Sequence, residues 1–170
     1  MIDAKRRAEL DAAIELIHFS YRELVAHPDR VLAARGLARA HHRVLYFVAK
    51  LGAPAVSELL RALGVSKQAL AGPLRDLAAQ ALVRFERGAA DARVKHVVLT
   101  EAGRKLEARL AARQRQAFAQ AFAAAGATAE GGWRAVMAVL AADAMRRAGI
   151  RVPATPAPPG RPPGGSTAAG

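Results

Sequence analysis

The chain contains no cysteine, which excludes several kinds of site at once. Disulfide bonds, thiolate zinc sites, iron–sulfur clusters and thiol redox switches all need cysteine. Long apolar runs are also missing, because charged residues interrupt the hydrophobic stretches, as Arg43 and Lys50 do on either side of residues 44–49. A membrane-spanning helix needs about 20 consecutive, mainly apolar residues. We therefore expect a cytoplasmic protein that does not span a membrane.

Acidic residues are scarce beside basic ones. The 170 residues include 26 Lys and Arg against 14 Asp and Glu, which gives a formal net charge of +12. Such a surplus favours an anionic partner, because clustered cations attract a polyanion and release its condensed counterions. The surplus is spread along the whole chain, and chains rich in alanine and arginine are often basic through composition alone. The site must therefore be sought in the spacing of residues.

Motifs for catalysis are absent as well. The chain has no phosphate-binding glycine loop, nucleophile elbow, His-Glu-x-x-His string or paired carboxylates. His41 and His42 are adjacent, but neighbours on a helix point about 100° apart. Glu15 and His18 form an i, i+3 pair on an expected helix. We expect no enzyme activity, no cofactor and no metal site, with a histidine-based metal or ligand contact as the open alternative.

Hydrophobic periodicity predicts a mainly helical chain. Apolar residues recur at steps of three and four from Leu10 to Leu24, which indicates a first helix that ends near His27-Pro28. A break at Gly126 and Thr128 separates two further apolar stripes. The expected helices cover about residues 4–27, 37–51, 56–63, 67–81 and 101–125, followed by a last helix that ends at Gly149.

Two short helices joined by a tight turn form the most informative pattern. Gly64 can adopt the left-handed conformation that ends the helix at 56–63, and Ser66 can cap the helix at 67–81. Gly72-Pro73 interrupts this second helix, where an interior proline costs ~3 kcal/mol. Either the helix is bent there, which its continuous leucine stripe favours, or it starts later in the chain.

The period then changes from that of a helix to that of a strand. Residues 82–87 and 94–99 alternate between apolar and polar side chains around a turn-like tip at 88–92, which predicts a β-hairpin. An isolated hairpin is marginal in water, so it must pack against the helices beside it. A helix pair followed by a hairpin is typical of a winged helix-turn-helix, in which the second helix enters the major groove.

The expected fold class is therefore mainly α with a small β-hairpin wing (α+β), in one domain over residues 1–152. Residues 153–170 hold six of the nine prolines and few large apolar side chains. Such a segment cannot offset its ordering entropy by burial, and we expect a disordered tail.

Several strings of residues carry a family resemblance. They are Leu59 through Ser66, Lys67-Gln68-Ala69-Leu70, Leu74-Arg75-Asp76-Leu77 and above all Asp91-Ala92-Arg93 running into Leu99-Thr100-Glu101-Ala102-Gly103. On these residues the sequence resembles the MarR family of transcriptional regulators over about residues 10–150. The resemblance implies a sequence-specific homodimer on double-stranded DNA, with dimerisation helices at about 4–27 and 101–149 and a DNA-binding lobe at about 53–100.

The resemblance also implies roles for individual residues. Arg93 at the wing tip would reach the narrow minor groove, where negative potential favours a guanidinium, and Asp91 would orient it. Gln68 would read a base, at the start of the recognition helix. The residues expected to bind DNA are Ser66, Lys67, Gln68, Arg75, Arg87, Asp91, Arg93 and Lys95.

Members of the family commonly bind small aromatic or phenolic effectors between the dimer region and the DNA-binding lobe. The polar groups that the resemblance offers for such a ligand are His18, Tyr21, His41 and Tyr46. The alternative function is a nucleoid-associated or protein-interaction module of the same fold with little sequence specificity, which the Gly72-Pro73 break favours. The ratio of affinities for operator-like and random DNA would separate the two.

Overall fold

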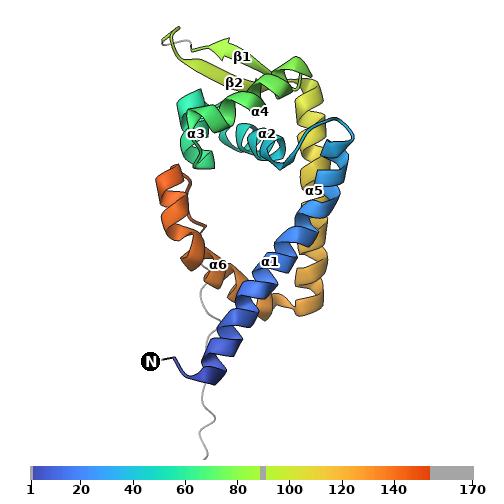
Figure 1. Cartoon of the computed structure of the whole chain (residues 1–170), viewed down its shortest axis with the longest axis vertical. Helices are drawn as coiled ribbons and strands as arrows, with labels where there is room; N and C mark the ends of the chain where they lie inside the picture. Colours follow the sequence, from blue (N-terminus) through green and yellow to red (C-terminus); the bar gives the residue numbers. More distant parts are fainter. Residues whose placement is uncertain (1, 89–90, 154–170) are drawn as a thin grey trace, which may run out of the picture. The chain divides into compact units, whose positions relative to one another are not determined.

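The computed structural model describes residues 2–88 and 91–153 (Figure 1). The elements are α1 (Ala4–Ala33), α2 (Arg39–Leu51), α3 (Val56–Leu63), α4 (Lys67–Ala79), β1 (Val83–Arg87), β2 (Lys95–Leu99), α5 (Glu101–Ala125) and α6 (Ala127–Ala148). The expected fold class, mainly helical with one two-stranded hairpin, is confirmed. The chain divides into two compact units, residues 1–118 and 119–170. The expected tail lies outside the described residues except for Pro153.

Two of the predicted breaks in helices are wrong. α1 does not end near His27-Pro28 but continues through Pro28 to Ala33. Pro28 is among the most deeply buried side chains, so the packing of its ring offsets the backbone hydrogen bond that a proline cannot make. Thr128 does not break the chain either, because α6 already begins at Ala127, directly after Gly126 with its left-handed φ of 85°.

α4 is a single helix from Lys67 to Ala79 with Pro73 inside it, so the alternative of a later start is wrong. Both predicted ends of the helix-turn-helix are confirmed. Gly64 closes α3 with a φ of 64°, and the Ser66 hydroxyl accepts a hydrogen bond from the Ala69 N–H at 3.2 Å. The buried stripe of α4 consists of Leu70, Leu74 and Leu77.

The core of the first unit is built around α2, which packs against α1, α3, α4 and β2. Leu45 is fully buried on α2, and side chains from every neighbouring element close around it. The principal members of this cluster are Leu32, Val44, Leu45, Val48, Leu59, Leu77, Leu82, Val97 and Leu110. The helix-turn-helix and the hairpin therefore share one continuous hydrophobic core.

The hairpin pairs in antiparallel register from Val83 with Leu99 to Arg87 with Lys95. It packs against the helices as expected. The Val97 N–H donates to the Pro54 carbonyl at 2.9 Å, and His96 Nδ1 lies 2.9 Å from the Ala53 carbonyl oxygen. These contacts fix the base of the wing to the connection between α2 and α3.

Thr100 joins the hairpin to α5 and caps the helix. Its hydroxyl donates to the Ala81 carbonyl at 2.6 Å and accepts from the Gly103 N–H at 3.0 Å. A Cβ atom added at Gly103 would lie 1.9 Å from the Leu82 carbonyl oxygen. Only glycine at residue 103 lets α5 approach the backbone of Leu82, just before β1, this closely.

The described part of the second unit contains the end of α5 and α6. Phe122 and Trp133 meet edge to face at 5.3 Å between ring centroids, and the guanidinium of Arg134 lies 5.4 Å from the Phe122 ring. α6 has no buried residue, and its apolar side chains Val136, Val139 and Leu140 are exposed. Among the described residues, no helix has the length and hydrophobicity needed to cross a membrane.

Candidate nucleic-acid interface

The first turn of α4 presents polar and basic side chains to solvent. Ser66, Lys67 and Gln68 are all exposed, and this turn contains no acidic residue. The free N–H groups and the dipole at a helix N-terminus favour an anion there. Arg75, also exposed, lies two turns further along α4. The arrangement suits contact with phosphates and base edges by α4.

The wing carries the other four predicted residues. Arg93 donates to the Asp91 carboxylate through its backbone N–H at 2.9 Å and through Nε at 3.2 Å. These hydrogen bonds, the backbone one first, hold the pKa of Asp91 below its ordinary value and keep it ionised. The Arg93 side chain is 92% exposed. The expected pairing of Asp91 with Arg93 is therefore present, and it leaves the guanidinium open to solvent.

The eight residues form two groups within the first unit, four at α4 and four on the hairpin. α4 packs against β1, and Figure 1 shows the hairpin beside it. Arg87 and Lys95 are both exposed and lie opposite each other in the strand register. Two basic elements of the same compact unit thus lie next to each other.

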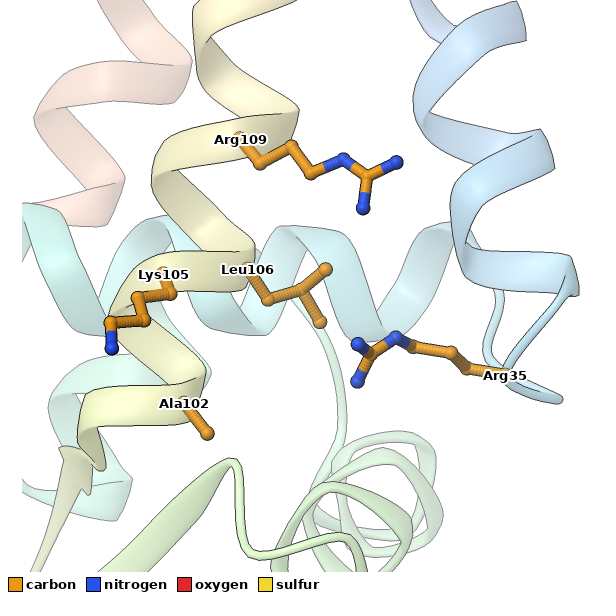
Figure 2. Close-up of a pocket in the computed structure, with 5 residues that line it drawn as sticks. All are labelled: Arg35, Ala102, Lys105, Leu106 and Arg109. Carbon is orange, nitrogen blue, oxygen red and sulfur yellow. The ribbon is translucent and has the colours of Figure 1, made fainter.

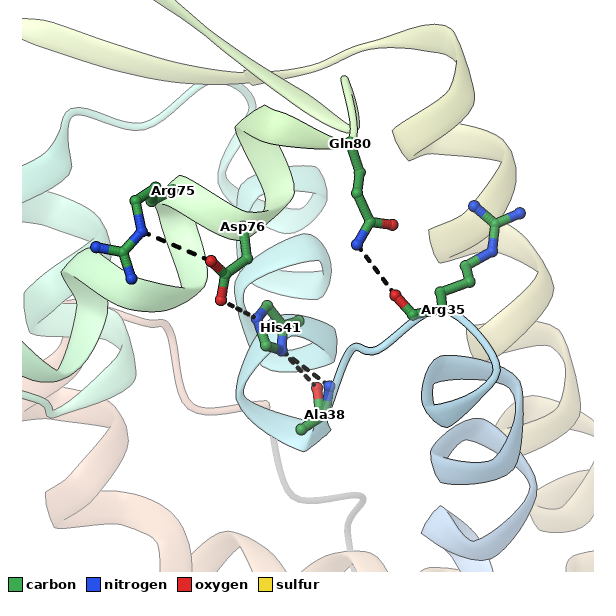
Figure 3. A network of polar contacts seen from close by, with 6 residues as sticks. All are labelled: Arg35, Ala38, His41, Arg75, Asp76 and Gln80. Atoms are coloured by element: carbon green, nitrogen blue, oxygen red, sulfur yellow. Dashed lines mark hydrogen bonds and ion pairs between the residues drawn. The ribbon is translucent and has the colours of Figure 1, made fainter.

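α4 is also held by polar contacts from the region around the start of α2 (Figure 3). His41 Nε2 lies 3.2 Å from Asp76 Oδ2, and Gln80 Nε2 donates to the Arg35 carbonyl at 3.1 Å. Sequence reasoning missed both contacts. The residues of each pair are 35 and 45 positions apart, so no local spacing signals them.

The four residues expected to contact an effector do not gather at one site. Tyr21 lies under the Arg39 guanidinium at 5.4 Å, whereas the rings of His18 and Tyr46 pack against their neighbours Phe19 and Phe47. His41 is buried and uses both ring nitrogens for contacts within the chain. No contact joins any two of the four in the described residues.

A basic pocket that sequence reasoning missed lies between the α1–α2 connection and α5 (Figure 2). Its volume is about 260 Å³, and it is lined by Arg35, Ala102, Lys105, Leu106 and Arg109. Lys105 pairs with Glu101 at 2.6 Å, whereas Arg35 and Arg109 have no ion-pair partner among the described residues. The i, i+3, i+4, i+7 spacing of the α5 residues was the only signal available in the sequence.

His42 differs from its neighbour His41, because its buried Nε2 has no hydrogen-bond partner in the described structure. Burial lowers the pKa of His42 below its ordinary value, against a weaker opposing influence of Asp29. The ring is therefore held neutral. Over the described ranges, no cluster of three or more His, Asp and Glu side chains could hold a metal ion.

Known proteins similar to this chain are regulators of transcription. The sequence model of the MarR family matches residues 35–94. The HTH-type transcriptional regulator PetP of Rhodobacter capsulatus is 40% identical over 139 residues, which cover 82% of this chain and 84% of PetP. The transcriptional regulator PA3341 has a similar crystal structure, with 28% identity, a TM-score of 0.64, and coverage of 78% of this chain and 97% of that one.

A third similar structure comes from Bordetella bronchiseptica. It is BpsR, whose DNA binding is regulated by 6-hydroxynicotinic acid. The two structures match with 23% identity and a TM-score of 0.50, over 65% of this chain and 84% of BpsR. At that identity the likeness shows the fold alone. The identity and coverage of PetP show the family. The chain belongs to the MarR family and is a DNA-binding transcriptional regulator of that type, not an enzyme.

Proposed function

We propose that this regulator acts as a homodimer on a pseudo-palindromic DNA site, with α4 in the major groove and the wing in the minor groove. The observation that carries the proposal is the pair of adjacent basic elements, the capped start of α4 and the hairpin that holds Arg93 against Asp91. Two-fold symmetry in the protein requires matching half-sites in the DNA. A regulator of this kind works in the cytoplasm.

The roles of single residues follow from the chemistry of each position. Gln68, with a donor and an acceptor at the start of α4, is the candidate for reading a base edge. Arg93 supplies a cation for the minor groove, where the potential is most negative. The remaining candidates contact phosphates, namely Ser66, Lys67, Arg75, Arg87 and Lys95.

Exposed apolar residues on the terminal helices support the homodimer. α1 leaves Ile14, Ile17 and Phe19 at least half exposed, and α6 leaves Val139 77% exposed. Exposed large apolar side chains on each of these helices suit contact with a partner surface. We assign α1 and the helices after residue 100 to dimerisation. Sedimentation at micromolar concentration should give a dimer, and a monomer that also binds DNA as a monomer would refute the assignment.

The DNA-binding proposal is tested by selecting bound duplexes from a random pool. The wild-type chain should select a pseudo-palindrome. Arg93→Ala should weaken binding to selected and random duplexes alike and lower the slope of log affinity against log salt by about 1, because one released counterion is lost. Gln68→Ala should cost ~1 to 3 kcal/mol on the selected duplex and little on random DNA.

The same measurement distinguishes the alternative, a nucleoid-associated or protein-interaction module with little sequence choice. That module would bind selected and random duplexes with similar affinity, and Gln68→Ala would change both equally. The Gly72-Pro73 break was one reason to favour this alternative. That reason is weaker because α4 runs through Pro73 as one helix, so its exposed start is continuous with the buried leucine stripe that anchors the helix.

We further propose an aromatic or phenolic effector that carries a negative charge. The basic pocket supports this class of ligand, because Arg35 and Arg109 offer guanidinium groups around the apolar side chains of Ala102 and Leu106. BpsR, whose DNA binding is regulated by 6-hydroxynicotinic acid, supports regulation by such a molecule. Titration calorimetry with aromatic acids should give binding that Arg109→Ala abolishes, whereas equal binding by the variant would place the site elsewhere.

A further inference from the structure

α2 makes polar contacts with both helices of the helix-turn-helix. The Arg43 guanidinium donates to the Leu63 carbonyl at 3.0 Å, at the end of α3, and His41 contacts Asp76 on α4. The apolar packing of α4 rests on three leucines, whose contacts are not directional. A hydrogen bond is directional, so the contact with α2 can set the rotation of α4 about its own axis.

His41 contacts Asp76 through Nε2, and its Nδ1 lies against both the N–H and the carbonyl oxygen of Ala38 (Figure 3). The Ala38 N–H donates to Nδ1 at 2.9 Å, which is shorter than the 3.3 Å from Nδ1 to the Ala38 carbonyl oxygen, so Nδ1 is the acceptor and Nε2 the donor. Nε2 then donates to Asp76 Oδ2 at 3.2 Å, and Asp76 Oδ1 lies 3.7 Å from Arg75 Nε. The His41 side chain is 10% exposed, so water competes little for these contacts.

We propose that His41 is a positioning residue for DNA recognition, which acts through Asp76 on Arg75 and on the rotation of α4. The inference rests on the proposed function of α4 as the recognition helix. A binding site needs its groups placed to within about 0.5 Å and 10–20°, and second contacts of this kind supply that precision. Of the Asp76 side chain, 47% is exposed, so its contribution to the core is small.

Charge gives the proposal a distinctive signature. Asp76 is a carboxylate on the helix that would face DNA, close to Arg75, and it therefore repels phosphates. Removing it should strengthen binding to random DNA. If Asp76 positions α4, the same change should weaken the preference for the selected duplex. A purely structural role would change both affinities by the same factor and leave the preference unchanged.

The experiment measures binding of the full chain to its selected duplex and to a random duplex by fluorescence anisotropy at several salt concentrations. His41→Ala and Asp76→Ala should each reduce the ratio of the two affinities by about fivefold to tenfold, the equivalent of one hydrogen bond. The double variant should lose no more than either single one, because both remove the same contact.

Two further variants serve as controls. Asp76→Asn keeps a carbonyl oxygen that accepts from His41 Nε2, so it should retain most of the preference. His27→Ala removes a histidine that makes no polar contact in the described structure, and its ratio should equal that of the wild type. Circular dichroism and sedimentation establish that each variant is folded and has the assembly state of the wild type.

An unchanged ratio in folded His41→Ala and Asp76→Ala would overturn the inference, and so would additive losses in the double variant. A loss of equal size on both duplexes would also overturn it, because that indicates a lower folded fraction rather than a misplaced helix. These outcomes leave the proposed function intact as long as the wild-type chain discriminates. A wild-type chain without any preferred duplex would refute both.

Discussion

The contact between Gly103 and Leu82 leads to a quantitative prediction about the base of the wing. A Cβ atom at residue 103 would lie 1.9 Å from the Leu82 carbonyl oxygen, and real Cβ contacts essentially never fall below 3.0 Å. In Gly103→Ala the two groups must therefore move apart by about 1 Å. That movement strains the hydrogen bond from the Thr100 N–H to the same carbonyl, which is 3.1 Å long.

Overpacking of this kind costs ~1 to 3 kcal/mol, and the weakened hydrogen bond adds ~1 kcal/mol. Against this, alanine favours a helix interior over glycine by ~1 kcal/mol. We expect Gly103→Ala to lower the free energy of unfolding by ~1 to 3 kcal/mol in urea, measured at one fixed protein concentration.

Gly132→Ala on α6 is the matched control, because a Cβ atom there would meet no atom within 4 Å. This variant should gain ~0.5 to 1 kcal/mol from helix propensity alone. If Gly103→Ala were as stable as Gly132→Ala and bound DNA like the wild type, the close approach of α5 to Leu82 would not hold in solution.

Three other predictions follow from single residues. Burial lowers the pKa of His42 in the folded state, so below about pH 6.5 the unfolded chain binds a proton that the folded chain does not. The Tm should therefore fall as the pH decreases, and it should fall less in His42→Leu. Pro73→Ala should raise the free energy of unfolding by ~1 to 3 kcal/mol, because it restores a helical N–H; equal stability in urea would contradict this. Asp91→Ala should weaken DNA binding less than Arg93→Ala does in anisotropy titrations, because it frees the guanidinium without removing it.

Features that depend on neighbours in sequence could be predicted, because their physics is local. The left-handed Gly64 and the cap at Ser66 involve residues at most three positions apart, and so does the Asp91–Arg93 pair, which the family resemblance implied. A cap needs only a side chain oxygen and a free N–H one turn away. Such features are specified by the order of residues alone.

Features that depend on tertiary packing could not be predicted in the same way. Because proline disrupts helix interiors, the sequence predicted that α1 ends near residue 27. In the structure the burial of Pro28 outweighs the lost hydrogen bond, and that burial depends on how α1 packs against its neighbours. The contact of His41 with Asp76 and the pocket lined by both Arg35 and Arg109 likewise join segments that are distant in sequence. From the sequence, His41 was a candidate for an effector or metal contact and not for positioning α4, because nothing local connects it to that helix.

The two compact units satisfy the hydrophobic effect in different ways. The first unit closes its own core around α2, so its fold is stable through contacts within the chain. α6 has no buried residue and leaves Trp133, Val139 and Leu140 exposed, whereas most of a helix's stability in a protein comes from the packing of its apolar face. In the proposed homodimer, a second copy would supply the apolar surface that stabilises α6. The order of α6 would then be coupled to protein concentration, whereas the order of the DNA-binding lobe would not.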